Sequence, residues 1–132
     1  MLKKVKIAIS ILFFLSLIYG CQSDNASDET LVSDAEYVYN SIKNSYVDGM
    51  SDGKNDKVGE FVNTYLVNSS KYQSHEELLL KMDALINNDR MYTLASGLKE
   101  DEQTIENYKN QLEGNLLDLD KYFKKNKAEN KN

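Results

Sequence analysis

The chain has 132 residues, enough for one domain, with 16 basic and 21 acidic side chains. Three of the basic ones, Lys3, Lys4 and Lys6, lie in the first 20 residues, so the remaining 112 residues carry a net charge of −8. A surface this acidic excludes nucleic acid as an expected partner and disfavours contact with anionic lipid headgroups. Proline is absent, which favours helices joined by glycine, asparagine and serine turns.

The N-terminus has the organisation of a signal peptide. A short basic stretch precedes an apolar or small-residue run at 7–19, and Gly20 and Cys21 follow. Thirteen helical residues rise about 20 Å, which is shorter than the roughly 30 Å hydrocarbon core of a bilayer. This length fits a signal peptide better than a membrane span. The positive charges keep that end in the cytoplasm, so the chain beyond the apolar run is expected to cross the membrane.

The residues Ile18, Tyr19, Gly20 and Cys21 resemble a lipobox, the processing signal of bacterial lipoproteins. That family has an aliphatic residue at −3, a small residue at −1 and cysteine at +1; position −2, usually small, is Tyr19 here. The resemblance implies that Cys21 receives a diacylglyceryl group and becomes the lipidated N-terminus after cleavage. The alternative is an incidental buried thiol behind an uncleaved anchor. A disulfide within the chain is excluded, because Cys21 is the only cysteine.

After the expected signal peptide at 1–20, residues 21–30 are interpreted as a flexible tether because they are small, polar and acidic. A helical domain is expected at 31–125. Its first helix, starting at a cap on Asp28 or Ser33, should end near Gly49, before the strong turn signal at 48–56. Its apolar stripe has helical spacing. The stripe comprises Leu31, Ala35, Val38, Ile42 and Tyr46.

Two further helices are expected in the middle of the chain. The first covers about 55–67 and carries Val58, Phe61, Val62, Tyr65 and Leu66 on one face. The second begins at a capping box, with Ser74 as N-cap and Glu77 three positions later. It should stop near Asn87 and Asn88, and residues 91–98 should form a separate short helix.

The longest helix is expected over about 100–125. Apolar residues form a seam along it, with spacings of 3, 4, 4, 3 and 4. The seam comprises Ile105, Tyr108, Leu112, Leu116, Leu119 and Phe123. Gly114 interrupts it and suggests a close approach of another helix. Residues 126–132 should be a disordered tail. The predicted fold class is all-α, a small bundle of three to four helices.

The sequence favours a protein that is not an enzyme. His75 is the only histidine, and without a partner it is interpreted as an exposed surface residue. Asp48, Asp52 and Asp56 suggest a calcium loop, but an EF-hand register would place Met50 and Gly59 at ligand positions. We therefore expect a solvated turn. No thiol, zinc, phosphate-loop or nucleophile motif is present, so no catalytic residue, metal or cofactor is predicted.

Nine tyrosines are the one compositional feature that points to binding. Tyrosine offers a large contact area at low entropy cost together with a polar tip. The competing explanation is that tyrosine fills the edge of a small core without tryptophan. Tyr37, Tyr72 and Tyr92 fit the apolar stripes least well, so they are the candidate partner-binding residues.

These features predict a lipid-anchored protein on the extracytoplasmic face of the cell membrane, similar to lipoproteins of low-GC Gram-positive bacteria. Its expected role is a small non-catalytic binding or inhibitory module of the exclusion or immunity type, with an envelope or incoming protein as partner. The main alternative is a structural or assembly factor that self-associates through the 105–123 seam. An enzyme that uses carboxylates alone, and a bioactive peptide cut from the signal segment, are further alternatives.

Overall fold

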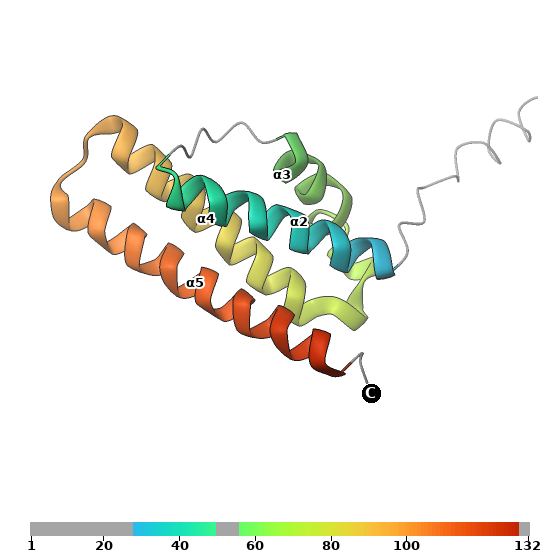
Figure 1. Ribbon diagram of the computed structural model, residues 1–132. Coiled ribbons are helices and arrows are strands. Elements are labelled where there is room, and N and C mark those ends of the chain that lie inside the picture. The colour runs from blue at the N-terminus through green and yellow to red at the C-terminus, as the bar shows by residue number, and fades with distance from the viewer. Residues whose placement is uncertain (1–27, 50–55, 130–132) are drawn as a thin grey trace, which may run out of the picture.

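The computed structural model describes residues 28–49 and 56–129 (Figure 1). This part of the chain holds four α-helices and three short helical turns, and no strand occurs in it. The prediction of a small all-α bundle is therefore confirmed. Cys21, the expected signal peptide and most of the tether lie outside the described residues, as do Met50 and Asp52 of the calcium pattern.

Helix α2 (Asp28–Val47) buries four of the five residues of the stripe expected of the first helix, and the fifth, Tyr46, is half-buried. Leu31, Ala35, Val38 and Ile42 are at most 4% exposed, and Tyr39 joins them in the core. The helix begins three residues before Leu31, so the expected tether boundary at residue 30 falls inside it. It ends where expected, because Gly49 has a φ of 68°, a conformation that glycine adopts without strain.

The chain between α2 and α4 forms short helices. Helix α3 (Asp56–Phe61) continues into a π-helical turn, η1 (Val62–Leu66), in which the Val67 N–H donates to the Val62 carbonyl at 3.0 Å. Two 3₁₀ turns come next, η2 (Ser69–Lys71) and η3 (Gln73–His75). We call residues 56–75 the short-helix segment. The capping box predicted on Ser74 is wrong, because Ser74 lies inside η3, and His75 takes the N-cap position without a side-chain cap.

Helix α4 (Glu76–Leu98) is continuous, so the predicted break at Asn87 and Asn88 is wrong. Both amide side chains have partners that are compatible with a helix. Asn87 donates to Asp83 one turn earlier at 3.1 Å, and Asn88 donates across to Asn115 at 2.7 Å. These bonds remove the competition with the backbone that makes asparagine unfavourable within helices. The expected short helix at 91–98 is consequently the last part of α4.

A tight turn connects α4 to α5 (Glu102–Glu129), and the two helices run antiparallel (Figure 1). Lys99 takes the left-handed conformation, with φ of 54°, and the Glu100 N–H donates to the Ala95 carbonyl at 3.0 Å. Asp101 then caps α5 by accepting from the Thr104 N–H at 3.0 Å and from its hydroxyl at 2.7 Å. These bonds hold the pKa of Asp101 below its ordinary value. The prediction that a disordered tail begins at residue 126 is wrong, because α5 extends through Glu129.

The seam of α5 packs within the chain. Leu112, Leu119 and Phe123 are buried, while Ile105, Tyr108 and Leu116 are half-buried. Gly114 does not mark a close helix approach as expected, because a methyl group added there would meet nothing within 4 Å. Half of the seam that we considered for self-association is thus occupied inside one copy, and the other half is partly exposed.

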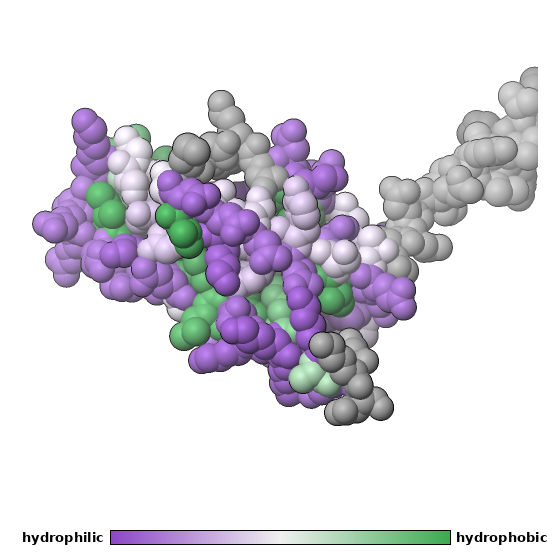
Figure 2. Space-filling model, in the orientation of Figure 1, coloured by the Kyte–Doolittle hydropathy of each residue, from purple (hydrophilic) through white to green (hydrophobic). Residues whose placement is uncertain are grey.

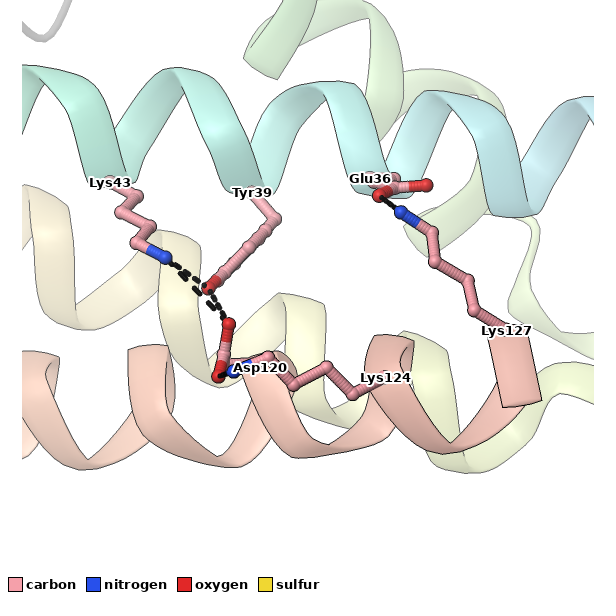
Figure 3. A network of polar contacts seen from close by, with 6 residues as sticks. All are labelled: Glu36, Tyr39, Lys43, Asp120, Lys124 and Lys127. Carbon is pink, nitrogen blue, oxygen red and sulfur yellow. Dashed lines mark hydrogen bonds and ion pairs between the residues drawn. The ribbon is translucent and has the colours of Figure 1, made fainter.

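A polar network joins α2 to α5 (Figure 3). Asp120 accepts from the Tyr39 hydroxyl at 3.3 Å and pairs with Lys124 at 2.6 Å and Lys43 at 3.7 Å. The bond from Lys124 is the main reason why the pKa of Asp120 lies below its ordinary value. Nearer the C-terminal end of α5, Lys127 pairs with Glu36. The network holds one side of α2 against α5 and leaves the opposite side for the short-helix segment.

Candidate binding surface

The structure does not bring the three candidate tyrosines together on one face. Tyr37 is 58% exposed, whereas Tyr72 is only 8% exposed. The Tyr72 ring packs against Tyr65 with centroids 5.3 Å apart. Tyr92 is half-buried and packs edge-on against Tyr46 at 5.8 Å. Only Tyr37 thus presents most of its side chain to solvent.

The sites of Tyr37 and Tyr92 lie on different sides of α2. Tyr92 contacts this helix at Tyr46, nine residues after Tyr37. At 100° per residue, nine positions turn the side chain to the opposite side of the helix. A partner that contacts Tyr37 therefore approaches α2 from the side away from Tyr92.

Tyr37 borders a hollow of about 240 Å³ between α2 and the short-helix segment. We call this site the Tyr37 hollow. Its residues come from one face of α2 and from α3 and η1. The lining comprises Ser33, Asp34, Tyr37, Val38, Lys57, Glu60, Phe61, Thr64 and Tyr65. The turn of η1 contributes Thr64 and Tyr65, and π-helical turns of this kind are frequent at functional sites.

One hydrogen bond joins the two elements that line the hollow. The buried Tyr65 donates its hydroxyl to Asp34 at 2.7 Å. Burial, followed by the interaction with the Asp34 carboxylate, raises the pKa of Tyr65 well above its ordinary value of 10.0. The phenol therefore remains a donor at neutral pH. Its ring also packs at 5.0 Å from Phe61, so Tyr65 connects the hollow to the core.

The rim of the hollow carries both signs of charge. Lys57 and Glu60 pair at 2.6 Å on the exposed side of α3, and Asp34 faces them from α2. The Tyr37 ring adds an apolar surface with a hydroxyl tip. An exposed aromatic ring beside two carboxylates and one ammonium group suits contact with a protein surface that carries apolar and basic side chains.

Histidine, cysteine and acidic side chains do not gather into a metal site in the described part of the chain. Within 28–49 and 56–129 no three histidine, cysteine or acidic side chains converge to hold a metal ion. His75 is less exposed than we expected, with 20% of its side chain accessible, and its Nε2 lies 3.7 Å from Asp28 Oδ2. Over the same residues, no helix combines the length and apolarity that crossing a bilayer requires.

Sequence reasoning found Tyr37 but missed the hollow beside it. The signal that was present is the spacing of Ser33, Asp34 and Tyr37, which places them on one side of α2, away from its buried stripe. The partners across the hollow come from residues 57–65, and their placement depends on how α3 and η1 pack. No local pattern encodes that packing.

The chain was compared with protein families, curated proteins and solved structures. No protein-family model, curated protein or solved structure is significantly similar to this chain.

Proposed function

We propose that this protein is a lipid-anchored module on the extracytoplasmic face of the cell membrane that binds, and thereby inhibits, an envelope or incoming protein. The anchor is Cys21, and the role is non-catalytic, of the exclusion or immunity type. The anchor part is supported by the resemblance of residues 18–21 to a lipobox. The binding part is supported by the Tyr37 hollow, which is the observation that carries the proposal.

The Tyr37 hollow suits a binding role because an exposed ring lies beside groups that are held in place. Tyr37 is 58% exposed, yet the adjoining Asp34 is held by Tyr65. A partner side chain that enters therefore meets groups that are already positioned, which lowers the entropy cost of binding. Tyrosine is a typical hot-spot residue of protein interfaces.

A crosslinking experiment in living cells tests the binding part. A photo-reactive amino acid at position 37 of the full chain should capture one dominant protein. The matched control is the same amino acid at Leu117, which is 56% exposed on α5. Equal capture at both positions, or capture of nothing at position 37, would contradict the proposed binding surface.

The anchor is tested separately by metabolic labelling with a fatty acid. We expect label on the wild-type chain and none on Cys21→Ala. Label that persists in Cys21→Ala would show that the lipid is attached elsewhere, and a wild-type chain without label would contradict a lipid anchor.

The inhibitory role is tested by comparing phage plating and conjugation efficiency in cells with and without the gene. Tyr37→Ala and Cys21→Ala should each return the efficiency to that of cells without the gene, while Leu117→Ala should not. Equal efficiencies across a broad panel of phages and donors would count against an exclusion role.

A further inference from the structure

Helix α4 carries large apolar side chains on two opposite sides. One side is in the core and comprises Leu78, Leu79, Met82, Leu85 and Ile86. The other faces solvent and comprises Leu80, Met91, Leu94 and Leu98, which are 63%, 38%, 54% and 64% exposed. We call these four residues the outer face of α4. A helix that carries large apolar side chains on two opposite sides is normally covered on both, so the outer face is expected to have a partner.

The four residues form one narrow stripe along the helix. At 100° per residue they lie within about 60° of one another around the helix axis. The exposed Asn87 lies in the same sector and the half-buried Ala84 lies next to it, both in the middle of α4. The stripe spans 19 residues, or about 28 Å of helix length, with the polar Asn87 between Leu80 and Met91. On the side of the molecule formed by α2 and α5, hydrophilic residues predominate and hydrophobic patches lie between them (Figure 2).

The outer face is self-complementary about its centre. If two copies of α4 cross antiparallel with a two-fold axis at Asn87, Leu80 of each copy lies opposite Leu94 of the other. Both leucines are seven residues, or about two turns, from the axis. A two-fold axis brings the same patch of both copies together, as this arrangement requires.

The charges beside the stripe fit the same arrangement. Asp83 and Arg90 are both exposed and lie on the same edge of the outer face, one on either side of Asn87. In an antiparallel pair related by a two-fold axis, matching edges meet, so Asp83 of each copy faces Arg90 of the other. This gives two ion pairs across the interface. A parallel two-fold pair would instead set Asp83 level with Asp83 and Arg90 level with Arg90, without this complementarity.

A hollow beside the first half of α4 is a further feature that is complementary to the second copy. It has a volume of about 550 Å³ and lies between α4 and the turns η1 to η3. Its lining includes Leu66, Leu79 and Leu80, together with Glu76 and Asp83. In the antiparallel arrangement Leu94 of the second copy projects toward this hollow. Each copy thus offers protruding leucines in the second half of α4 and a receiving hollow in the first half.

We propose that the outer face of α4 binds a second copy of this chain, with α4 packed antiparallel to α4 and Asn87 at the two-fold axis. The interface has a single helix at its centre and falls at the low end of the size range of specific complexes. We therefore expect a reversible dimer. This inference is independent of the Tyr37 hollow, which lies between α2 and the short-helix segment.

Disulfide trapping of the full chain in intact cells tests the proposal. Asn87→Cys places a thiol at the axis, where two copies bring their β-carbons close enough to bridge. The control is Asn40→Cys, at another exposed asparagine, on α2. The unaltered chain controls for Cys21, the only native cysteine. After mild oxidation we expect several-fold more disulfide-linked dimer from Asn87→Cys than from either control. Equal amounts, or no dimer from Asn87→Cys, would overturn the proposal.

A charge exchange in the Asn87→Cys chain distinguishes a specific interface from a folding effect. Asp83→Arg should lower the trapped dimer several-fold, because it places arginine opposite arginine. Adding Arg90→Asp should restore it. Within one chain the two positions are about two turns apart, so the rescue reports contact between copies. A double variant that traps no more dimer than Asp83→Arg would overturn the antiparallel arrangement.

The apolar contact is tested in the same assay with a pair of matched leucines. Leu94→Ser should lower trapping, while Leu117→Ser, at a similarly exposed leucine of α5, should not. Both variants should leave thermal unfolding nearly unchanged, since both side chains are largely exposed. If Leu94→Ser traps as well as the unaltered leucine, the outer face is not the interface.

Discussion

The hairpin formed by α4 and α5 and the short-helix segment at 56–75 differ in how they are held. The hairpin consists of two long, regular helices that pack along their length and are joined by a turn whose backbone groups are paired. The short-helix segment has only one α-helix, of six residues, followed by one π turn and two 3₁₀ turns without side-chain caps. Backbone regularity therefore stabilises the hairpin much more than the segment.

The short-helix segment is held by aromatic packing instead. Phe61, Tyr65 and Tyr72 are buried and form a consecutive set of ring contacts at 5.0 and 5.3 Å. The comparison of the two regions shows that an irregular backbone can form a defined surface when a few large side chains pack it against the core. In this protein the Tyr37 hollow borders the irregular part, whereas the hairpin supplies the framework beneath it.

Phe61→Ala is expected to have the largest effect, about 3–5 kcal/mol of lost stability, because Phe61 is 2% exposed and anchors the ring cluster. Denaturant unfolding measures this loss. Hydrogen exchange should show that amides at 56–75 lose protection well before those of the hairpin.

The control for Phe61→Ala is Leu112→Ala, which removes a fully buried side chain from the hairpin at a cost of about 2–5 kcal/mol. It should weaken protection throughout the described helices. If Phe61→Ala also weakens the whole molecule evenly, the two regions form one cooperative unit and the distinction drawn above is wrong.

Gly114→Ala is expected to stabilise the protein by about 1 kcal/mol, because alanine favours the interior of a helix and open space surrounds the site. The thermal unfolding midpoint should rise. Gly59→Ala is the matched change in α3, where space is equally open. It should raise protection of nearby amides with a smaller effect on global unfolding. A larger global gain from Gly59→Ala would contradict the view that the hairpin sets overall stability.

Lys99→Gly is expected to stabilise the hairpin turn by about 1 kcal/mol. Lys99 holds a left-handed conformation that strains residues with a side chain but not glycine. Chemical denaturation measures the gain. Glu100→Gly is the control, because it introduces glycine at the next position. Among the described residues other than glycine, Lys99 has a positive φ and Glu100 does not. Equal gains from both changes would show that the strain at Lys99 is not the cause.

Asp120→Asn should have the smallest effect, and the effect should depend on pH. Lys124 above all holds the folded-state pKa of Asp120 below its ordinary value of 3.8. The contribution of the carboxylate is fully present above that value and is lost as the pH falls through the folded-state pKa. The stability difference between wild type and Asp120→Asn should therefore be constant near neutral pH and shrink below about pH 4. A difference that grows as the pH falls would reverse the assigned sign.

Periodicity predicted the helical faces because burial of one side of a helix leaves a local trace. The stripe on α2 from Leu31 to Ile42, and the seam residues Leu112, Leu119 and Phe123, are buried as expected. Helix ends were harder to predict. The break expected at Asn87 and Asn88 is absent because Asn115, 27 residues further along the chain, bonds Asn88. The sequence pattern around Asn88 contains no information about a hydrogen-bond partner on another helix.

The candidate site was predicted only in part for the same reason. Tyr37 lies opposite a clear stripe, so its exposure follows from helical spacing. Tyr72 lies outside any regular helix, and its burial depends on the position of the Tyr65 ring. Tyr92 is covered by Tyr46 from α2. The exposure of an aromatic side chain that lies outside a clear apolar stripe therefore cannot be assigned without the tertiary structure.

The first and last described helices have a topological consequence. Asp28 and Glu129 leave the bundle at the same end, where Lys127 meets Glu36, and the turn at Lys99 lies at the other end (Figure 1). A circular permutant that joins 129 to 28 through a short flexible linker and opens the chain at 99–101 would keep every helix intact. Loop-closure entropy grows only slowly with linker length, so such a chain should keep the fold. Its new termini would then emerge beside Leu98, at the end of the outer face of α4.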